Sequence, residues 1–269
     1  MILTVDHVTR YSYDRAVRGV VQSHRLQPSV FEGQTVLAWD VTVSGGLRGG
    51  GFRDGAGDWV QGWSVAGPVT EIEVQVVGRI ETTDLSGMLR GHREVIAPAA
   101  YLGETAPTRA DAALRALGLQ ALGGADPLAA CHALSAAISA AIAYRPGTTH
   151  AHTTAAEAFA QGEGVCQDHA HALIAAARAA DIPARYVSGY LQSGNDGGDH
   201  EAAHAWAELH VAGYGWIGFD PANACCPDAR YIRLGSGLDA QDAAPIRGIS
   251  RGMGRESMVV TVAVQMAAQ

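Results

Sequence analysis

The sequence shows little of the pattern that directs a protein into or across a membrane, and we expect no such segment. It begins MILTVDHVTR, which has no positively charged stretch followed by a long apolar run. Its alanine-rich runs are interrupted by polar residues well short of the ~20 apolar residues that a membrane-spanning helix needs. We therefore expect a cytoplasmic protein with no membrane partner.

Cysteine is scarce as well. Only Cys131, Cys166, Cys225 and Cys226 occur among 269 residues, and the last two are adjacent. This pattern does not form a disulfide framework, so free thiols in a reducing compartment are expected. The sequence also has no CxxC pair with suitable second ligands for zinc and no EF-hand spacing for calcium. We expect neither a metal nor another cofactor.

An excess of basic residues is absent too. Lys and Arg number 19 against 27 Asp and Glu, which gives a formal net charge of -8 at pH 7. This balance gives no general electrostatic reason to bind nucleic acid or anionic lipid, and no nucleic acid partner is expected. The 48% hydrophobic and 17% charged residues are instead typical of a globular protein that buries its own core.

The first third of the chain has the alternating pattern of β-strands. Stretches such as ILTVDHVTRYSY and VTEIEVQVVGRIET alternate apolar and polar residues, and turn-forming segments such as SGGLRGGGFRDGAGD separate them. We predict an all-β, sandwich-like domain over residues 1–85. It contains no catalytic set of residues, so packing or recognition is its expected role.

The pattern becomes helical after Leu85. Residues 86–107 contain Gly and Pro and are predicted to form a linker, and helical periodicity begins at TRADAALRALG. A further helix is expected from Cys166 to Asp181, followed by the strands IPARYVSGYL, HAWAELHV and GWIGFDP. The sequence therefore predicts an α+β fold with a core over 108–269. The last strand, ESMVVTVAVQM, has no partner that the pattern assigns.

The segment GEGVCQDH places Cys166 at the junction of a glycine-containing loop and a helix. A thiol reacts as the thiolate, and the unpaired amides and dipole of a helix N-terminus favour a negative charge. Gly162 and Gly164 allow a sharp turn and the close approach of a substrate, and the amide of Cys166 is placed to bind an oxyanion. These features predict that Cys166 is a nucleophile.

A nucleophilic cysteine needs a base, and the base needs a group that orients it. His204 lies in AAHAWAELHV, a predicted strand, and Asp220 lies in GFDPAN, at the end of the next strand. A carboxylate there can accept the imidazole N–H and fix the tautomer. Cys166, His204 and Asp220 are therefore predicted to converge.

Three further residues are candidates for shaping this site. Asp168, in the first turn of the helix, is expected to stabilise the helix start and to hold the cysteine loop in shape. Trp206 lies two residues after His204 and shares its strand face, where it either walls the cleft or belongs to the core. Tyr190 in VSGYL is a weaker candidate for the cleft.

The segments GEGVCQDHAHALIAAARAADIPARYVSGYL and HAWAELHVAGYGWIGFDPAN resemble the core of the bacterial transglutaminase-like superfamily. TRYSYDRAV with SHRLQPS is similar to the N-terminal β region that accompanies this core, and CPDARYIRLGSGLDAQDAAPIRGISRG resembles its C-terminal extension. The resemblance implies a papain-like α+β core with Cys166, His204 and Asp220 as the triad. It also implies amide-bond chemistry on a peptide or protein substrate through a thioester acyl-enzyme.

The resemblance does not fix the reaction, because relatives of this fold include crosslinking enzymes, peptidases, deamidases and glycan-releasing amidases. A cysteine peptidase or amidohydrolase is the leading expectation, with transglutaminase-type acyl transfer to an amine close behind. A non-catalytic binding module that retains the fold is the alternative from another class. A redox-sensing protein that pairs Cys166 with Cys225 or Cys226 is the third.

Overall fold

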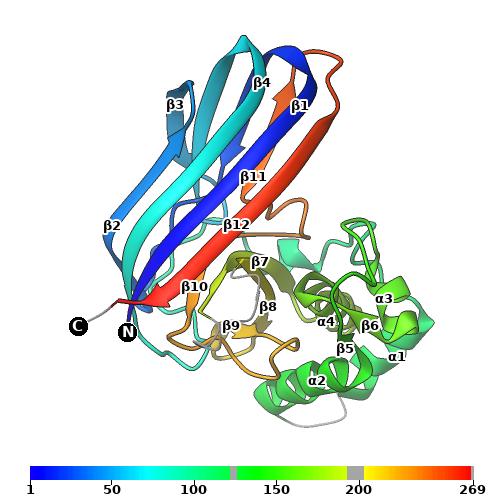
Figure 1. Cartoon of the computed structure of the whole chain (residues 1–269). Coiled ribbons are helices and arrows are strands. Elements are labelled where there is room, and N and C mark those ends of the chain that lie inside the picture. Colours follow the sequence, from blue (N-terminus) through cyan, green and yellow to red (C-terminus); the bar gives the residue numbers. More distant parts are fainter. Residues whose placement is uncertain (122–125, 193–202, 268–269) are drawn as a thin grey trace.

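The computed structural model describes residues 1–121, 126–192 and 203–267. A β region packs on a core of helices and a second, smaller sheet (Figure 1). The α+β class predicted from the sequence is confirmed. No helix within the described ranges is long and apolar enough to cross a membrane.

The β region is one antiparallel six-stranded sheet. Its central path is β11-β1-β4-β2, while β12 also pairs with β1 and β3 also pairs with β4. The strands are β1 (Ile2–His24), β2 (Gln34–Val43), β3 (Gly46–Arg53), β4 (Trp59–Thr82), β11 (Ile246–Ser250) and β12 (Glu256–Met266).

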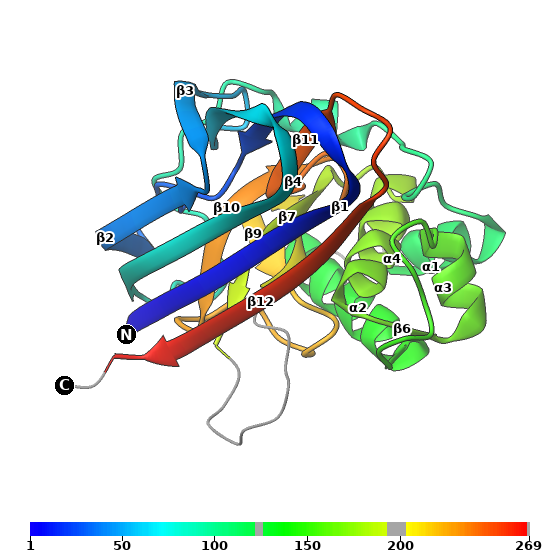
Figure 2. The ribbon, with the colours of Figure 1, turned by 45° about the horizontal axis from the view of Figure 1, so that its top comes forward.

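Strands β1 and β4 are long enough to bend and continue from one part of the sheet into the next (Figures 1 and 2). The register between them shifts twice between Ser12 and Gly19. In β1 the odd-numbered residues from Leu3 to Tyr13 are buried, whereas beyond the shift the even-numbered Val20 is buried. Because side chains alternate between faces, the shift keeps the apolar side of the strand inward through the bend.

The last strand of the chain completes this sheet. β12 runs antiparallel to β1, with Leu3 opposite Met266 and Tyr13 opposite Glu256. The two ends of the chain therefore lie side by side, and the amide of Ala267 donates to the carbonyl of Ile2 at 2.9 Å. β11 and β12 lie in the part of the sequence that we expect to belong to the C-terminal core, but they are strands of the sheet of the β region.

The core contains the antiparallel sheet β10-β7-β8-β9, with α4 against it and the other helices around α4 (Figure 2). Every residue of α4 from 168 to 178 is buried, and the alanines of this stretch allow neighbouring elements to pack closely against the helix. At Gly118 of α1 an added Cβ would lie 2.2 Å from the carbonyl oxygen of Ala176. The core elements are η1 (Pro98–Leu102), α1 (Ala112–Ala121), α2 (Pro127–Ala141), β5 (Ala143–Tyr144), α3 (Ala155–Gln161), β6 (Glu163–Gly164), α4 (Cys166–Ala179), β7 (Ala184–Leu191), β8 (Ala203–Val211), β9 (Gly215–Phe219) and β10 (Tyr231–Gly237).

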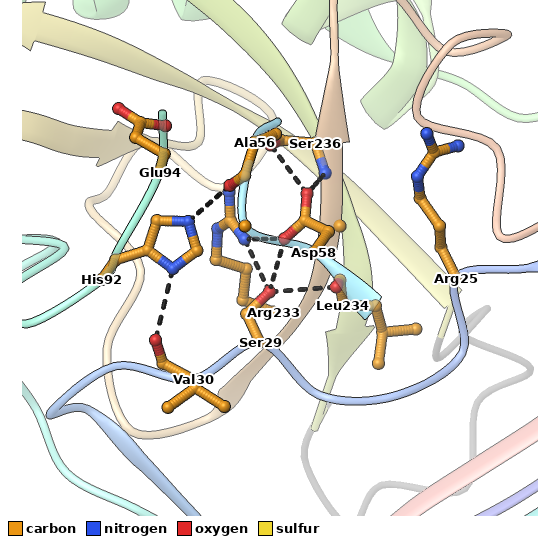
Figure 3. Close-up of polar contacts among 12 residues, drawn as sticks. Arg25, Ser29, Val30, Ala56, Asp58, His92, Glu94, Arg233, Leu234 and Ser236 are labelled. Atoms are coloured by element: carbon orange, nitrogen blue, oxygen red, sulfur yellow. Dashed lines mark hydrogen bonds and ion pairs between the residues drawn. The ribbon is translucent and has the colours of Figure 1, made fainter. Parts of the chain in front are cut away.

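A buried ionic cluster joins the β region to the core. Arg233 of β10 binds Asp58 Oδ1, in the segment before β4, at 2.8 Å, and Ser29 Oγ at 2.6 Å (Figure 3). Its Nε binds Glu208 Oε1 of β8 at 2.8 Å, and Glu208 also binds Arg185 of β7 at 2.7 Å. Because buried charges need close partners, this cluster holds the β region and the core sheet in one arrangement.

Candidate active site

Cys166 is the first residue of α4 and is partly exposed. The helix start is held by Asp168, which is 1% exposed. Its Oδ2 accepts the amide N–H of Val165 at 2.8 Å and the hydroxyl of Thr149 at 2.6 Å. Asp168 therefore ties the cysteine loop to the segment before α3, and its charge lies in the first turn, where the helix dipole favours it.

Gly164 leaves room for this carboxylate. An ideal Cβ at Gly164 would lie 2.7 Å from both Cβ and Oδ2 of Asp168, which is too close for a carbon atom. Gly162 ends α3 in the left-handed conformation, with φ of +72°. The backbone conformation thus requires glycine at position 162, and close packing requires it at position 164. The turn into α4 depends on both residues.

His204 and Asp220 come from neighbouring strands of the core sheet. His204 lies at the start of β8, and Asp220 follows the end of β9, which pairs antiparallel with β8. The Nε2 of His204 lies 2.6 Å from Asp220 Oδ2, and the two side chains are 6% and 0% exposed. His204 is also hydrogen-bonded to Cys166, so the imidazole joins the thiol and the carboxylate.

These contacts determine the charge of the imidazole. Burial alone lowers the pKa of His204, but hydrogen bonds with Asp220 and Cys166 outweigh burial and raise it to about 10. Burial by itself raises the pKa of Asp220, yet hydrogen bonds from His204, Asn223 and Tyr231 leave it below its ordinary value. The pair is therefore an imidazolium and a carboxylate at neutral pH.

Two residues that contact Asp220 were not predicted from the sequence. The Asn223 amide donates to Asp220 Oδ2 at 2.7 Å, and the Tyr231 hydroxyl donates to the same oxygen at 2.8 Å. Asn223 lies in the GFDPAN segment, only three residues after Asp220, and this short separation could have indicated the contact. Tyr231 had no such signal, because only the antiparallel pairing of β10 with β7 brings it there.

The predicted site-shaping residues are divided by the structure. Trp206 is 2% exposed and stacks near His204, with ring centroids 6.4 Å apart and planes inclined by 26°. Tyr190 lies elsewhere, buried in the apolar cluster shared with the β region, and its hydroxyl is 2.7 Å from Nδ1 of His7. The structure therefore brings Trp206 to His204 and places Tyr190 between the core and the β region.

The other three cysteines are poorly suited to be nucleophiles. Burial raises the pKa values of Cys131 and Cys226 to about 11. It also raises the pKa of Cys225 above its ordinary value. Thiols of this kind carry little thiolate at neutral pH, which disfavours a redox exchange between Cys166 and the adjacent pair. Among the described residues, no group of three or more His, Cys, Asp or Glu is arranged to hold a metal ion.

Comparison with known proteins identifies the family. The transglutaminase-like superfamily matches residues 115–221, and the bacterial transglutaminase-like N-terminal region matches residues 3–81. An uncharacterized protein of Mycobacterium leprae is 31% identical over 280 residues, covering 97% of this chain and 98% of the relative. An uncharacterized protein of Mycobacterium tuberculosis is 39% identical over 132 residues, covering 46% of this chain and 42% of the relative.

The fold also matches a crystal structure. A "Putative Cysteine Protease" from Cytophaga hutchinsonii aligns with a TM-score of 0.74 and 22% identity, covering 100% of this chain and 92% of that protein. This likeness extends over both the β region and the core. The chain belongs to the transglutaminase-like superfamily.

Proposed function

We propose that the protein is a cysteine peptidase or amidohydrolase that acts on an amide bond of a peptide or protein. The observation that carries this proposal is the position of His204, which is hydrogen-bonded to Cys166 and lies 2.6 Å from the buried Asp220. A thiol at a helix start, an imidazolium and a carboxylate in this order form the arrangement of a cysteine nucleophile with its acid–base partner.

In the first half-reaction, the Cys166 thiolate attacks the carbonyl carbon of the substrate amide. The backbone amide of Cys166 is placed to stabilise the oxyanion, because the first amides of a helix have no partner within it. The His204 imidazolium donates its proton to the leaving nitrogen as the C–N bond breaks. The products are a thioester on Cys166 and a free amine, while Asp220 remains ionised.

In the second half-reaction, His204 removes a proton from the acceptor, which attacks the thioester and releases the thiolate. Water as the acceptor gives a carboxylic acid, and a primary amine gives a new amide. Transglutaminase-type acyl transfer is the second candidate, because the family membership is compatible with it and it passes through the same thioester. The two reactions differ only in the acceptor.

The proposal is tested by the alkylation of Cys166 with iodoacetamide, followed by peptide mass spectrometry. At about pH 6, Cys166 is expected to react at least ~10-fold faster than Cys131, Cys225 and Cys226, whose thiols are the internal controls. In His204→Ala this advantage is expected to disappear. If Cys166 in the wild type reacts no faster than the controls, the proposal is wrong and a non-catalytic binding module becomes the better interpretation.

The acceptor is identified with a glutamine-containing peptide, incubated with and without a primary amine. Hydrolysis or deamidation products in both samples support the hydrolase, and an amine adduct that replaces them supports acyl transfer. Cys166→Ala is the control, since it removes the thioester and must abolish either product.

A further inference from the structure

The Asp220 carboxylate accepts more hydrogen bonds than a base-orienting carboxylate needs. Its Oδ2 accepts from His204 at 2.6 Å, from Asn223 at 2.7 Å and from Tyr231 at 2.8 Å. Its Oδ1 accepts the backbone amides of Ala222 at 3.1 Å and Asn223 at 3.3 Å. Since the side chain is fully buried, these donors replace water as the groups that stabilise its charge.

Tyr231 differs from the other donors in its surroundings. Asn223 is exposed, whereas Tyr231 is 5% exposed and opens strand β10. Its ring lies edge-on to both His204 and Trp206, with centroids 5.9 Å and 5.5 Å away. Burial raises the pKa of Tyr231, so its hydroxyl keeps the proton that it donates to Asp220. The position of this donor is thus set by packing on both sides.

Strand β10 is itself fixed on the side of the β region. Arg233, two residues beyond Tyr231, is held between Glu208 of β8 and Asp58. Asp58 also accepts the amide and hydroxyl of Ser236 at 2.7 Å and 3.0 Å (Figure 3). β8 carries both Glu208 and His204. The same buried cluster therefore contacts both β10, which carries Tyr231, and β8, which carries His204.

From this geometry we propose that Tyr231 is a positioning residue that acts through Asp220. Its hydroxyl holds Oδ2 toward His204 and stabilises the carboxylate, so that Asp220 stays ionised and the proton stays on the imidazole. This role rests on the proposed function of Cys166 and His204. It assigns to strand β10, and through Arg233 to the β region, a part in maintaining the charge of the active site.

The test compares Tyr231→Phe with Tyr190→Phe. Each variant removes one buried tyrosine hydroxyl and keeps the ring, but the Tyr190 hydroxyl contacts His7 and lies away from Asp220. The rate of Cys166 alkylation by iodoacetamide is measured against pH. Losing a donor to a charged group raises the pKa of Asp220, so the acid limb of the profile is expected to move up by about one pH unit in Tyr231→Phe. Tyr190→Phe is expected to retain the wild-type limb.

An unchanged acid limb in folded Tyr231→Phe, or an equal shift in Tyr190→Phe, overturns the proposal. If Tyr231→Phe does not unfold cooperatively, replacement of Tyr231 by 3-fluorotyrosine keeps the ring and makes the hydroxyl a stronger donor. The acid limb should then move down, and no movement overturns the proposal.

The carboxyl-carbon NMR signal of Asp220 separates this proposal from the proposed function. It follows the pKa of Asp220 directly, whether or not Cys166 is reactive. A raised Asp220 pKa in Tyr231→Phe supports the role of Tyr231 even where wild-type Cys166 shows no fast alkylation, a result that contradicts only the proposed function. An Asp220 titration equal to that of the wild type contradicts the role of Tyr231.

Discussion

His204 and Asp220 form a buried ion pair in which the imidazole Nε2 lies 2.6 Å from the carboxylate. The Cys166 thiol is a second hydrogen-bond partner of His204. Because both partners stabilise the imidazolium, its proton is coupled to folding.

The first prediction concerns stability at high pH. The pKa of His204 is raised from 6.5 to about 10, so its contribution is fully present below pH 6.5 and is lost as the pH rises through about 10. Urea unfolding of the wild type should show a fall in unfolding free energy between pH 7 and 10 that is absent from His204→Gln. Parallel curves for the two proteins over this range would contradict the raised pKa.

The second prediction concerns Gly164. A methyl group at Gly164 would lie within 2.7 Å of Asp168, which must then move away from Val165 and Thr149. Gly164→Ala is expected to lower the free energy of unfolding by about 1 to 3 kcal/mol and to slow Cys166 alkylation at least ~10-fold. Gly50→Ala is the matched control, because a Cβ at Gly50 meets nothing within 4 Å. Wild-type alkylation in Gly164→Ala would show that this close contact is not needed for the site.

The third prediction concerns the ionic cluster between the β region and the core. Asp58→Asn removes one charge and leaves Arg233 buried beside Glu208, so the free energy of unfolding should fall by about 3 to 5 kcal/mol. Glu73→Gln, which breaks an exposed pair with Arg10, should cost under about 1 kcal/mol. Denaturant titrations of both variants check this, and equal losses would mean that the buried cluster contributes no more than a surface pair.

The fourth prediction follows from the absence of lysine, since all 19 basic side chains are arginine. If Cys166 transfers acyl groups to amines, no lysine of a second copy of the chain is available as acceptor, and the amine of Met1 already donates to the Thr82 carbonyl. Incubation of the protein alone should therefore give no covalent oligomers in denaturing electrophoresis, while an added amine should be incorporated into a glutamine peptide. Oligomers that resist reducing agent would contradict this expectation.

The sequence indicates the three candidate site residues more clearly than the residues that hold them in position. Cys166, His204 and Asp220 stand out because each lies at the end of a helix or strand with recognisable periodicity, and that local pattern survives folding. Tyr231 contacts Asp220 only through the strand order of the sheet, which no local pattern encodes. The pairing of β12 with β1 joins residues more than 240 positions apart and was equally inaccessible.

Tyr190 is a residue that the sequence suggested for the cleft and that the structure places elsewhere. As a strand tyrosine it is the weaker candidate for the cleft, and in the structure it pairs across the sheet with Ala203, the residue before His204. Whether its side chain meets the substrate or the β region depends on which face of the sheet that region covers. The docking of the β region decides this, and that docking involves the buried ionic cluster around Arg233 as well as the apolar cluster to which Tyr190 belongs.

The last prediction concerns acid. Burial lowers the pKa values of His7, His24 and His171 to about 4, from 6.5. The unfolded chain therefore binds protons that the folded protein excludes, so their stabilising contribution is present above pH 6.5 and is lost progressively as the pH falls toward 4. At about pH 5 each histidine should reduce the free energy of unfolding by about 2 kcal/mol relative to neutral pH.

His171→Gln isolates one of these groups, because the glutamine carbonyl can accept the Ala240 amide that His171 Nε2 accepts at 3.0 Å. Between pH 6.5 and 4 the unfolding free energy of this variant should fall less steeply than that of the wild type, by the equivalent of one proton. His152→Gln, at an exposed position, should retain the wild-type slope. Identical slopes for all three proteins would mean that the pKa of His171 is not lowered by folding, so that its buried ring takes up a proton and carries a charge, which the Asp239 carboxylate favours and the Arg178 guanidinium opposes.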